Sequence, residues 1–287
     1  MATAQMRWGS APELIGPRHV YRVRRLARWL QAAVPSGHVL DAGCGAGTLT
    51  GILARDGYQV TAIDGSHEFV AHVRARMAAA GLADRVEVRQ SDLQHPDLPD
   101  ARFDGAVCGE VLEHLPDDAA AVRAIVRALK PGGVLVLSVP AGADRYDWLD
   151  EWAGHERRYD EAALRKLLGG AGLQIEALVR WGFPFMALYE RHVQRPGLAR
   201  AGRPGSQGGL IARLARSRAV TLGLGALFRV DELFDGSQSG TGFLARARKP
   251  PAVPYRTTAQ AQATTDCPSP PQATTDCPSP TAVGEAR

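Results

Sequence analysis

The sequence predicts an α/β protein with a doubly wound, mainly parallel seven-stranded sheet, helices on both faces and an insertion before the last strand. Two observations lead to this prediction. Between residues 39 and 140, short apolar runs alternate with segments of helical periodicity, and the turns between them are short. The first apolar run is followed by three alternate glycines, which is typical of a tight turn from a strand into a helix.

The elements follow from the spacing of apolar residues. Val20, Val23, Leu26 and Leu30 recur at helical spacing among arginines, which predicts an amphipathic helix before the first strand. This helix caps either the ligand pocket or the core. After a first strand beginning at residue 39, strands are predicted at 58–64, 85–89, 103–108, 134–140, 173–179 and 242–247, and helices at 49–56, 69–81, 117–129 and 160–168.

The chain divides into three parts. Residues 1–35 are an N-terminal segment with the cap helix, and residues 36–249 form the main domain with an insertion at 181–240. Residues 250–287 are rich in Pro, Thr, Ala, Gln and Ser, and residues 262–270 repeat as 272–280. Such a composition cannot build a core, so we expect a disordered tail.

Composition limits the compartment and the partners. The formal net charge of +4 is small for 287 residues, so an anionic partner is allowed but not required. The four cysteines show neither a disulfide framework nor metal-ligand spacing, and no apolar run approaches the roughly 20 residues of a spanning helix. We therefore expect a cytoplasmic protein with no metal. The sequence does not indicate the oligomeric state.

The stretch 39–50 is the centre of the predicted site. A strand meets Asp41, then Gly43, Gly45 and Gly47, and then a helix. Glycines let a flat ligand lie against the backbone, and a helix start offers unpaired N–H groups, so we expect a nucleotide-like ligand. A dinucleotide loop would need glycine where this chain has Thr48. A plain strand-to-helix turn is the alternative.

An acid also ends the second predicted strand. Asp64 could accept hydrogen bonds from both hydroxyls of a ribose, and the carboxyl ends of neighbouring parallel strands line one crevice. We therefore expect Asp41 and Asp64 to face the same ligand. The alternative is that Asp64-Gly65-Ser66 only caps the next helix.

Two further phrases complete a family resemblance. Glu110-Val-Leu-Glu-His-Leu follows the fourth strand, and Lys130-Pro-Gly-Gly precedes the fifth. With the glycine loop, they resemble the motifs of class I S-adenosylmethionine-dependent methyltransferases, which have a Rossmann-like fold. The stretch Gly154-His-x-Arg-Arg-Tyr resembles sequences of the broad small-molecule and quinone-type group of these enzymes. The resemblance covers about the middle third of the chain. It implies S-adenosylmethionine as cofactor and in-line methyl transfer to a small-molecule hydroxyl or amine.

The resemblance also assigns residues. In the family, an acid after the third strand contacts the adenine amino group and an apolar neighbour packs on the ring; Asp92 and Leu93 match by type and position. A simple Ser-Asp turn is the alternative there. The expected cofactor-binding set is Asp41, Gly43, Gly45, Gly47, Asp64, Asp92, Leu93 and Glu110.

Two histidines are candidates for a general base. His114 follows the fourth strand and His155 lies beyond the fifth; a neutral imidazole suits proton transfer near pH 7, and Glu113 or Glu156 could orient it. The alternatives are a capping His114 and a His155 that only packs. The residues 157–159, Arg-Arg-Tyr, either bind an anionic group of the substrate or neutralise acids around the pocket.

The insertion, from Trp181 to Gly240, is expected to shape the substrate pocket. Its basic linker, residues 195–209, and its apolar stretch, residues 219–228, suggest peripheral membrane contact; a lid packed on its own domain is the alternative.

Two other functions compete with methyl transfer. A nicotinamide-dependent reductase is disfavoured by Thr48 and by the absence of a Tyr-x-x-x-Lys pair. A non-catalytic protein that retains the cofactor fold and binds a partner or nucleic acid is the other, although we see no clear nucleic-acid site.

Overall fold

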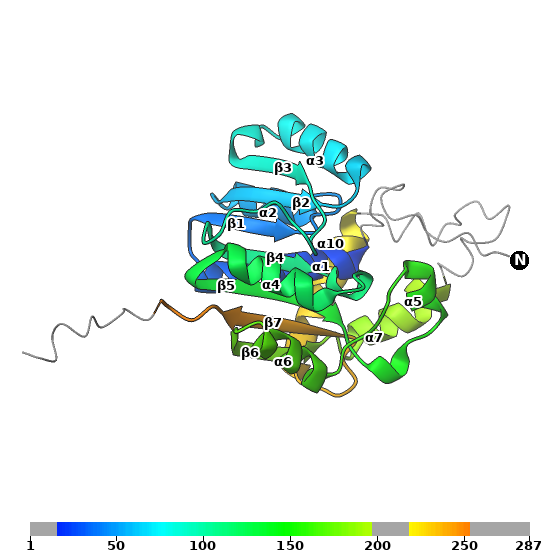
Figure 1. Ribbon diagram of the computed structural model, residues 1–287. Coiled ribbons are helices and arrows are strands. Elements are labelled where there is room, and N and C mark those ends of the chain that lie inside the picture. Colours follow the sequence, from blue (N-terminus) through cyan, green and yellow to red (C-terminus); the bar gives the residue numbers. More distant parts are fainter. Residues whose placement is uncertain (1–15, 197–217, 253–287) are drawn as a thin grey trace, which may run out of the picture. The chain divides into compact units, whose positions relative to one another are not determined.

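A computed structural model describes residues 16–196 and 218–252, and within them seven strands form one sheet in the order β3-β2-β1-β4-β5-β7-β6 (Figure 1). The first five strands in sequence are parallel, and β7 runs antiparallel to both β5 and β6. Their bounds are β1 His38–Ala42, β2 Gln59–Asp64, β3 Val86–Gln90, β4 Phe103–Gly109, β5 Leu129–Pro140, β6 Gln174–Trp181 and β7 Gly242–Arg248. The predicted mainly parallel seven-stranded sheet is confirmed.

Helices cover both faces of this sheet (Figure 1). One buried cluster joins α1, α2 and α10 to alternate strand residues such as Val39 and Val136, while another joins α4 and α6 to residues of the opposite parity, such as Leu40 and Leu137. The α-helices are α1 Pro17–Ala33, α2 Thr48–Arg55, α3 His67–Ala79, α4 Asp118–Ala128, α5 Trp148–Ala153, α6 Glu161–Gly170, α7 Phe185–Tyr189 and α10 Arg218–Val230. The short helices are η1 Ala83–Arg85, η2 Leu112–His114, η3 Ala143–Arg145, η4 Glu190–Gln194 and η5 Asp231–Phe234.

The turn from β1 into α2 has the geometry that its glycines allow. Gly43 and Gly47 have φ values of 78° and 74°, in the left-handed region that disfavours side chains. The N–H groups of Gly43 and Cys44 both donate to the carbonyl of Ile63, each at 2.9 Å, which fastens the loop to the end of β2. The helix begins at Thr48, one residue before the predicted start at Leu49.

One predicted boundary is wrong. The fifth strand begins at Leu129 and not at Val134, because Leu129 already pairs with Phe103 of β4 before a register shift. The Lys130-Pro-Gly-Gly stretch, which was expected to precede the fifth strand, is therefore an irregularity inside it, with Gly132 at φ 80°. The other predicted strands end within two residues of their observed ends.

Some expectations concern residues that are not described. Residues 1–15, the part of the basic linker within 197–217, and the repeat-containing tail from residue 253 onward lie outside the described ranges. Among the helices that are described, none combines the length and the apolar character needed to cross a membrane.

The glycine loop gives a test of the local geometry. A Cβ added at Gly43 would lie 2.4 Å from Cγ2 of Val111, whereas Gly172, with a similar φ of 82°, has nothing within 4 Å. Gly172→Ala should therefore cost only the backbone penalty, about 1–2 kcal/mol. Gly43→Ala should cost about 3 kcal/mol, because overpacking adds to that penalty. Urea unfolding measures both; equal losses would show that the Val111 contact exerts no constraint.

Candidate active site

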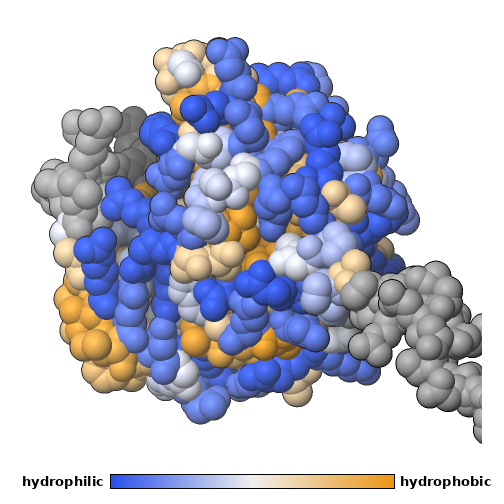
Figure 2. Space-filling model, turned by 90° about the vertical axis from the view of Figure 1, so that its left-hand side faces the viewer, coloured by the Kyte–Doolittle hydropathy of each residue, from blue (hydrophilic) through white to orange (hydrophobic). Residues whose placement is uncertain are grey.

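The predicted site residues meet at one edge of the sheet. The glycine loop follows β1, Asp64 ends β2, Asp92 follows β3 and Glu110 follows β4. Because β3, β2, β1 and β4 are parallel neighbours, these positions share the edge where the strands end, and ligands of open α/β sheets bind at that edge. Figure 2 looks onto the opposite end, where the parallel strands begin, and shows a mostly hydrophilic surface.

Asp64 organises the glycine loop. Its Oδ2 accepts from the N–H of Gly45 and its Oδ1 accepts from the N–H of Ser66, each at 2.9 Å. Burial raises the pKa of Asp64, and these two hydrogen bonds act in the opposite direction. The capping role falls to Ser66, whose hydroxyl accepts from the N–H of Phe69 at the start of α3. Each Asp64 oxygen keeps a further lone pair, which a ribose hydroxyl can use.

Asp41 has a different environment. It is 2% exposed, and its Oδ2 accepts a hydrogen bond of 2.6 Å from the hydroxyl of Thr50 in α2. This contact ties the end of β1 to the helix that follows the loop. The contacts therefore support a positioning role for Asp41, and its predicted contact with the ligand stays a prediction.

The side chains of Asp92 and Leu93 differ in burial. Asp92 is exposed, and its Oδ1 accepts from the N–H of Gln94 at 2.9 Å, as in a simple turn. Leu93 is 5% exposed and belongs to the core cluster. Asp92 remains accessible to a ligand, while Leu93 also serves the core.

Glu110 is held in a strained conformation under α1. Its φ of 58° is unusual for a residue with a side chain, and such strain persists only where the surroundings enforce it. Arg22 and Arg18 of α1 lie 3.4 and 3.7 Å from its carboxylate. Although burial opposes ionisation, these guanidinium groups lower the pKa of Glu110. The cap helix thus covers this part of the site with positive charge.

The structure brings the two candidate bases together. The ring centroids of His114 and His155 are 4.7 Å apart, with the planes at 74°. His114 Nδ1 donates to the carbonyl of Gly154 at 3.1 Å, and burial followed by the proximity of His155 lowers the pKa of His114 to about 4. Its imidazole is therefore neutral at pH 7.

The acid that holds His155 is Asp150, which was not among the predicted site residues. His155 Nδ1 lies 2.7 Å from Asp150 Oδ1, and Arg158 Nε lies 2.8 Å from both Asp150 oxygens. Burial opposes ionisation of Asp150, but the hydrogen bonds from His155 and Arg158 lower its pKa to about 2. A sequence signal existed, because Asp147 and Asp150 form a capping box at the start of α5.

The sequence neighbours of Arg158, Arg157 and Tyr159, also make contacts within the protein. Arg157 donates to the carbonyls of Leu115 and Pro116 and lies 3.3 Å from Asp118. The hydroxyl of Tyr159 donates to Asp118 Oδ2 at 2.6 Å. These contacts favour the alternative that residues 157–159 neutralise acids and hold the loop in place.

Glu113 is the most unusual acid of the site. It is fully buried, and neither of its carboxylate oxygens has a hydrogen-bond partner among the described residues. Burial and then the charge of Glu110 raise the pKa of Glu113 well above its ordinary range. Its backbone carbonyl accepts a hydrogen bond of 2.7 Å from the N–H of Glu156. The two acids that were expected to orient the histidines therefore connect the loops after β4 and β5 through their main chains.

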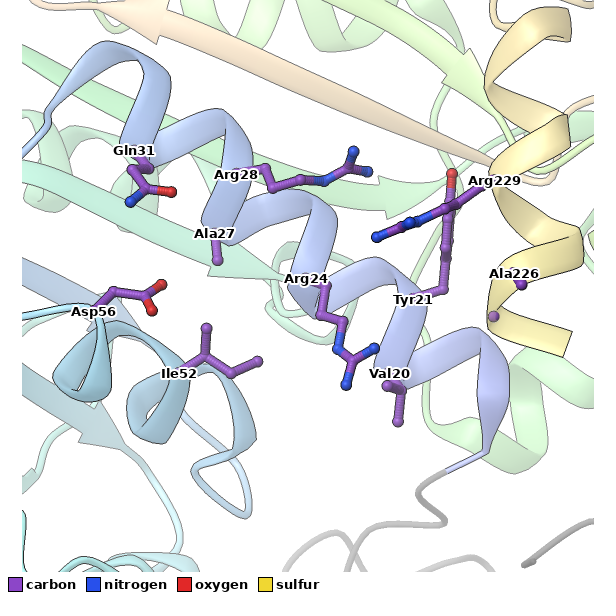
Figure 3. Close-up of a pocket in the computed structure, with 11 residues that line it drawn as sticks. Val20, Tyr21, Arg24, Ala27, Arg28, Gln31, Ile52, Asp56, Ala226 and Arg229 are labelled. Atoms are coloured by element: carbon purple, nitrogen blue, oxygen red, sulfur yellow. The ribbon is translucent and has the colours of Figure 1, made fainter. Parts of the chain in front are cut away.

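The insertion packs on the cap helix. Phe228 of α10 is buried with its ring centroid 6.0 Å from that of Tyr21, and Asp231 accepts from the N–H groups of Phe185 and Met186 at the start of α7. The predicted apolar stretch 219–228 is thus within α10. A hollow of about 390 Å³ lies between α1, α2 and α10, bordered by Arg24, Arg28, Arg229 and eight other residues (Figure 3). It does not include the glycine loop.

Comparison with known proteins finds likenesses to methyltransferases. A family model described as a methyltransferase domain matches residues 40–137. A ubiquinone biosynthesis O-methyltransferase of Xanthomonas campestris pv. campestris is 38% identical over 133 residues, which are 46% of this chain and 55% of that protein. A probable S-adenosylmethionine-dependent methyltransferase of Mycolicibacterium smegmatis is 37% identical over 48% of this chain and 52% of that protein. The chain spans about half the length of these curated relatives.

Solved structures extend the likeness to most of the chain. The [4+2]-cyclase SpnF is 26% identical with a TM-score of 0.56, over 80% of this chain and 81% of that chain. A putative sarcosine dimethylglycine methyltransferase from Galdieria sulphuraria, 19% identical with a TM-score of 0.60 over 81% and 86%, shares the fold. Residues 40–137 thus resemble a methyltransferase domain, as the motifs predicted.

The Asp150 contacts predict a pH-dependent loss of stability. Asp150→Asn should cost about 3 kcal/mol at pH 7, because Arg158 and His155 lose a buried charged partner. The folded pKa of about 2 lies below the ordinary 3.8, so the difference in stability between the native protein and the variant should be complete above about pH 5 and be lost as the pH falls through 2. Urea unfolding across this range measures it, with the exposed neighbour Glu151→Gln as control. An advantage that does not change with pH would contradict this account.

Proposed function

We propose that the protein is an S-adenosylmethionine-dependent methyltransferase that methylates an oxygen of a small-molecule acceptor. The observation that carries the proposal is the glycine loop fastened to Asp64 at the end of the parallel strands. The likeness to a ubiquinone biosynthesis O-methyltransferase supports oxygen as the acceptor atom. We assign the acceptor only to this class of small molecule.

The residues of the site fit the cofactor. Positive φ at Gly43 and Gly47 lets the backbone approach a flat ligand, and Asp64 retains acceptor capacity for ribose hydroxyls. The cofactor supplies a methyl group on a positively charged sulfur, so the protein has chiefly to align the acceptor. Positioning of this kind can lower a barrier by as much as about 7–11 kcal/mol.

A hydroxyl acceptor loses its proton when its oxygen is methylated. His114, whose pKa is near 4, is neutral at pH 7, and His155 is oriented by Asp150. Either imidazole could accept the proton, a contribution of roughly 10²–10⁴-fold in rate. We propose these two residues as the candidates for general base. We also propose a reducing, cytoplasmic compartment, because Cys44 and Cys108 both remain thiols.

Cofactor binding is the first test. Asp64→Ala should weaken the binding of S-adenosylhomocysteine by about 1–3 kcal/mol, because the ribose loses a charged acceptor and the loop loses its contact at Gly45. Isothermal titration calorimetry measures the affinity, and Asp84→Ala makes the same change at an exposed acid. If both variants bind S-adenosylhomocysteine with equal affinity, Asp64 does not contribute to the cofactor site.

A second candidate function is cofactor binding without methyl transfer. It is favoured by one observation, the 26% identity to a protein described as a [4+2]-cyclase across most of both chains. Incubation with S-adenosylmethionine and a panel of hydroxylated aromatic compounds separates the two functions. Methylated product and S-adenosylhomocysteine in equal amounts support transferase activity. Tight cofactor binding with no turnover on any compound favours the second function.

We also propose that the insertion contacts a membrane surface. Exposed large apolar side chains gather in it, with Leu233 82% exposed; the others are Leu188, Val193, Leu227, Val230 and Phe234. Arg229 of α10 supplies positive charge beside them. Apolar side chains next to basic ones suit the interface of an anionic bilayer.

Vesicle binding tests this contact. Replacing Leu233 and Phe234 together with serine should weaken sedimentation with phosphatidylglycerol vesicles at least about tenfold, because burying each side chain contributes roughly 1.5–3 kcal/mol. Trp148→Ser, an exposed aromatic residue outside the insertion, is the control. Unchanged binding of the double variant would mean that this patch does not face lipid.

A further inference from the structure

We propose that the hollow between α1, α2 and α10 is a second binding site, for a small, freely diffusing amphiphile that carries one carboxylate or phosphate group. Its volume of about 390 Å³ lies in the range of pockets that hold small organic molecules, about 300–1,000 Å³. Charged and apolar residues both line it (Figure 3). The hollow does not include the glycine loop, and the proposal does not rest on methyl transfer.

The charged part of the lining is mainly positive. Arg24 and Arg28 of α1 and Arg229 of α10 line the hollow, and Asp56, which follows α2, is the one acid among the described lining residues. Figure 3 shows Arg28 and Arg229 extending toward each other across the space between their helices. Like charges that face each other repel, and an anion bound between them would remove that repulsion. The lining therefore favours a negatively charged group.

Two of these arginines are available to a ligand. Arg28 Nη2 donates to Glu232 Oε1 at 2.6 Å, and the hydroxyl of Tyr21 donates to the same oxygen. Arg24 and Arg229 are both exposed, and neither forms a hydrogen bond or an ion pair with the described residues. The forked N–H groups of a guanidinium match the oxygens of a carboxylate or a phosphate. These two side chains can thus bind the anionic group from α1 and from α10.

The apolar part of the lining determines the rest of the ligand. Val20 and Ala27 of α1, Ile52 of α2 and Ala226 of α10 contribute it. Apolar surface that these side chains remove from water stabilises the bound ligand in addition to the charged contacts. A hollow of this size can hold a medium-length alkyl chain or an aromatic body, but not both chains of a bilayer phospholipid. We therefore infer a free amphiphile as the occupant.

Calorimetry on the full-length protein tests the proposal. Decanoate and decyl phosphate, each below the concentration at which it forms micelles, are the probes. We expect saturable binding at one site for both. The affinity should be the same with and without saturating S-adenosylhomocysteine, because the hollow lies apart from the glycine loop. Uncharged decanol should bind at least about tenfold more weakly.

Variants of the lining locate the bound probe. Arg24→Gln and Arg229→Gln should each weaken decanoate binding about threefold and together about tenfold, as expected for partly exposed charge pairs. Asp56→Asn should strengthen it about twofold, a gain that misfolding cannot produce. Ala226→Phe should weaken it at least about tenfold, because the ring occupies the hollow. Arg55→Gln, a change at an exposed arginine of α2 that does not line the hollow, is the control.

Three results would overturn the proposal. The first is competition between decanoate and S-adenosylhomocysteine. The second is native affinity for decanoate in the Arg24 and Arg229 double variant, or in an Ala226→Phe protein that circular dichroism shows to be folded. The third is binding to phosphatidylglycerol vesicles, dependent on both arginines, by a protein that does not bind monomeric decanoate; the arginines would then serve a membrane surface. Loss of methyl transfer with decanoate binding intact would count only against the proposed function.

Discussion

The structure depends on how the end of β1 is joined to the end of β2. The carbonyl of Ile63 accepts from two successive N–H groups of the glycine loop, and the side chain of Asp64 accepts from a third. These bonds fix a turn that only glycines can make, and they place its N–H groups and an acid beside each other at the edge where the parallel strands end. The cofactor site that we propose is a consequence of this junction.

The junction was predictable from the sequence because its signals are local. Three alternate glycines after an apolar run, followed by a helical segment, specify strand, turn and helix within a dozen residues, and Asp64 ends the next apolar run. The mainly parallel sheet followed from the alternation of strands with helices. The start of β5 could not be placed because a Pro-Gly-Gly phrase normally ends a strand, and only its pairing with Phe103 extends the strand to Leu129.

The second half of the site was not predictable, since it depends on contacts between distant residues. His114 and Gly154 are 40 positions apart in sequence, yet a hydrogen bond joins them. Sequence spacing proposed Glu113 and Glu156 as partners for the histidines, whereas folding brings Asp150 to His155 and leaves Glu113 buried beside both rings. The loop after β5 thus completes a site begun by the loop after β4, and only the fold shows that they meet.

Amide hydrogen exchange with and without S-adenosylhomocysteine tests the central claim most directly, since it reports where the ligand binds. The account predicts that protection increases at residues 43–47 and 64–66, whose N–H groups surround the proposed cofactor site. Protection confined to the helices that border the hollow between α1, α2 and α10, or no change at the glycine loop with the ligand bound, would contradict it.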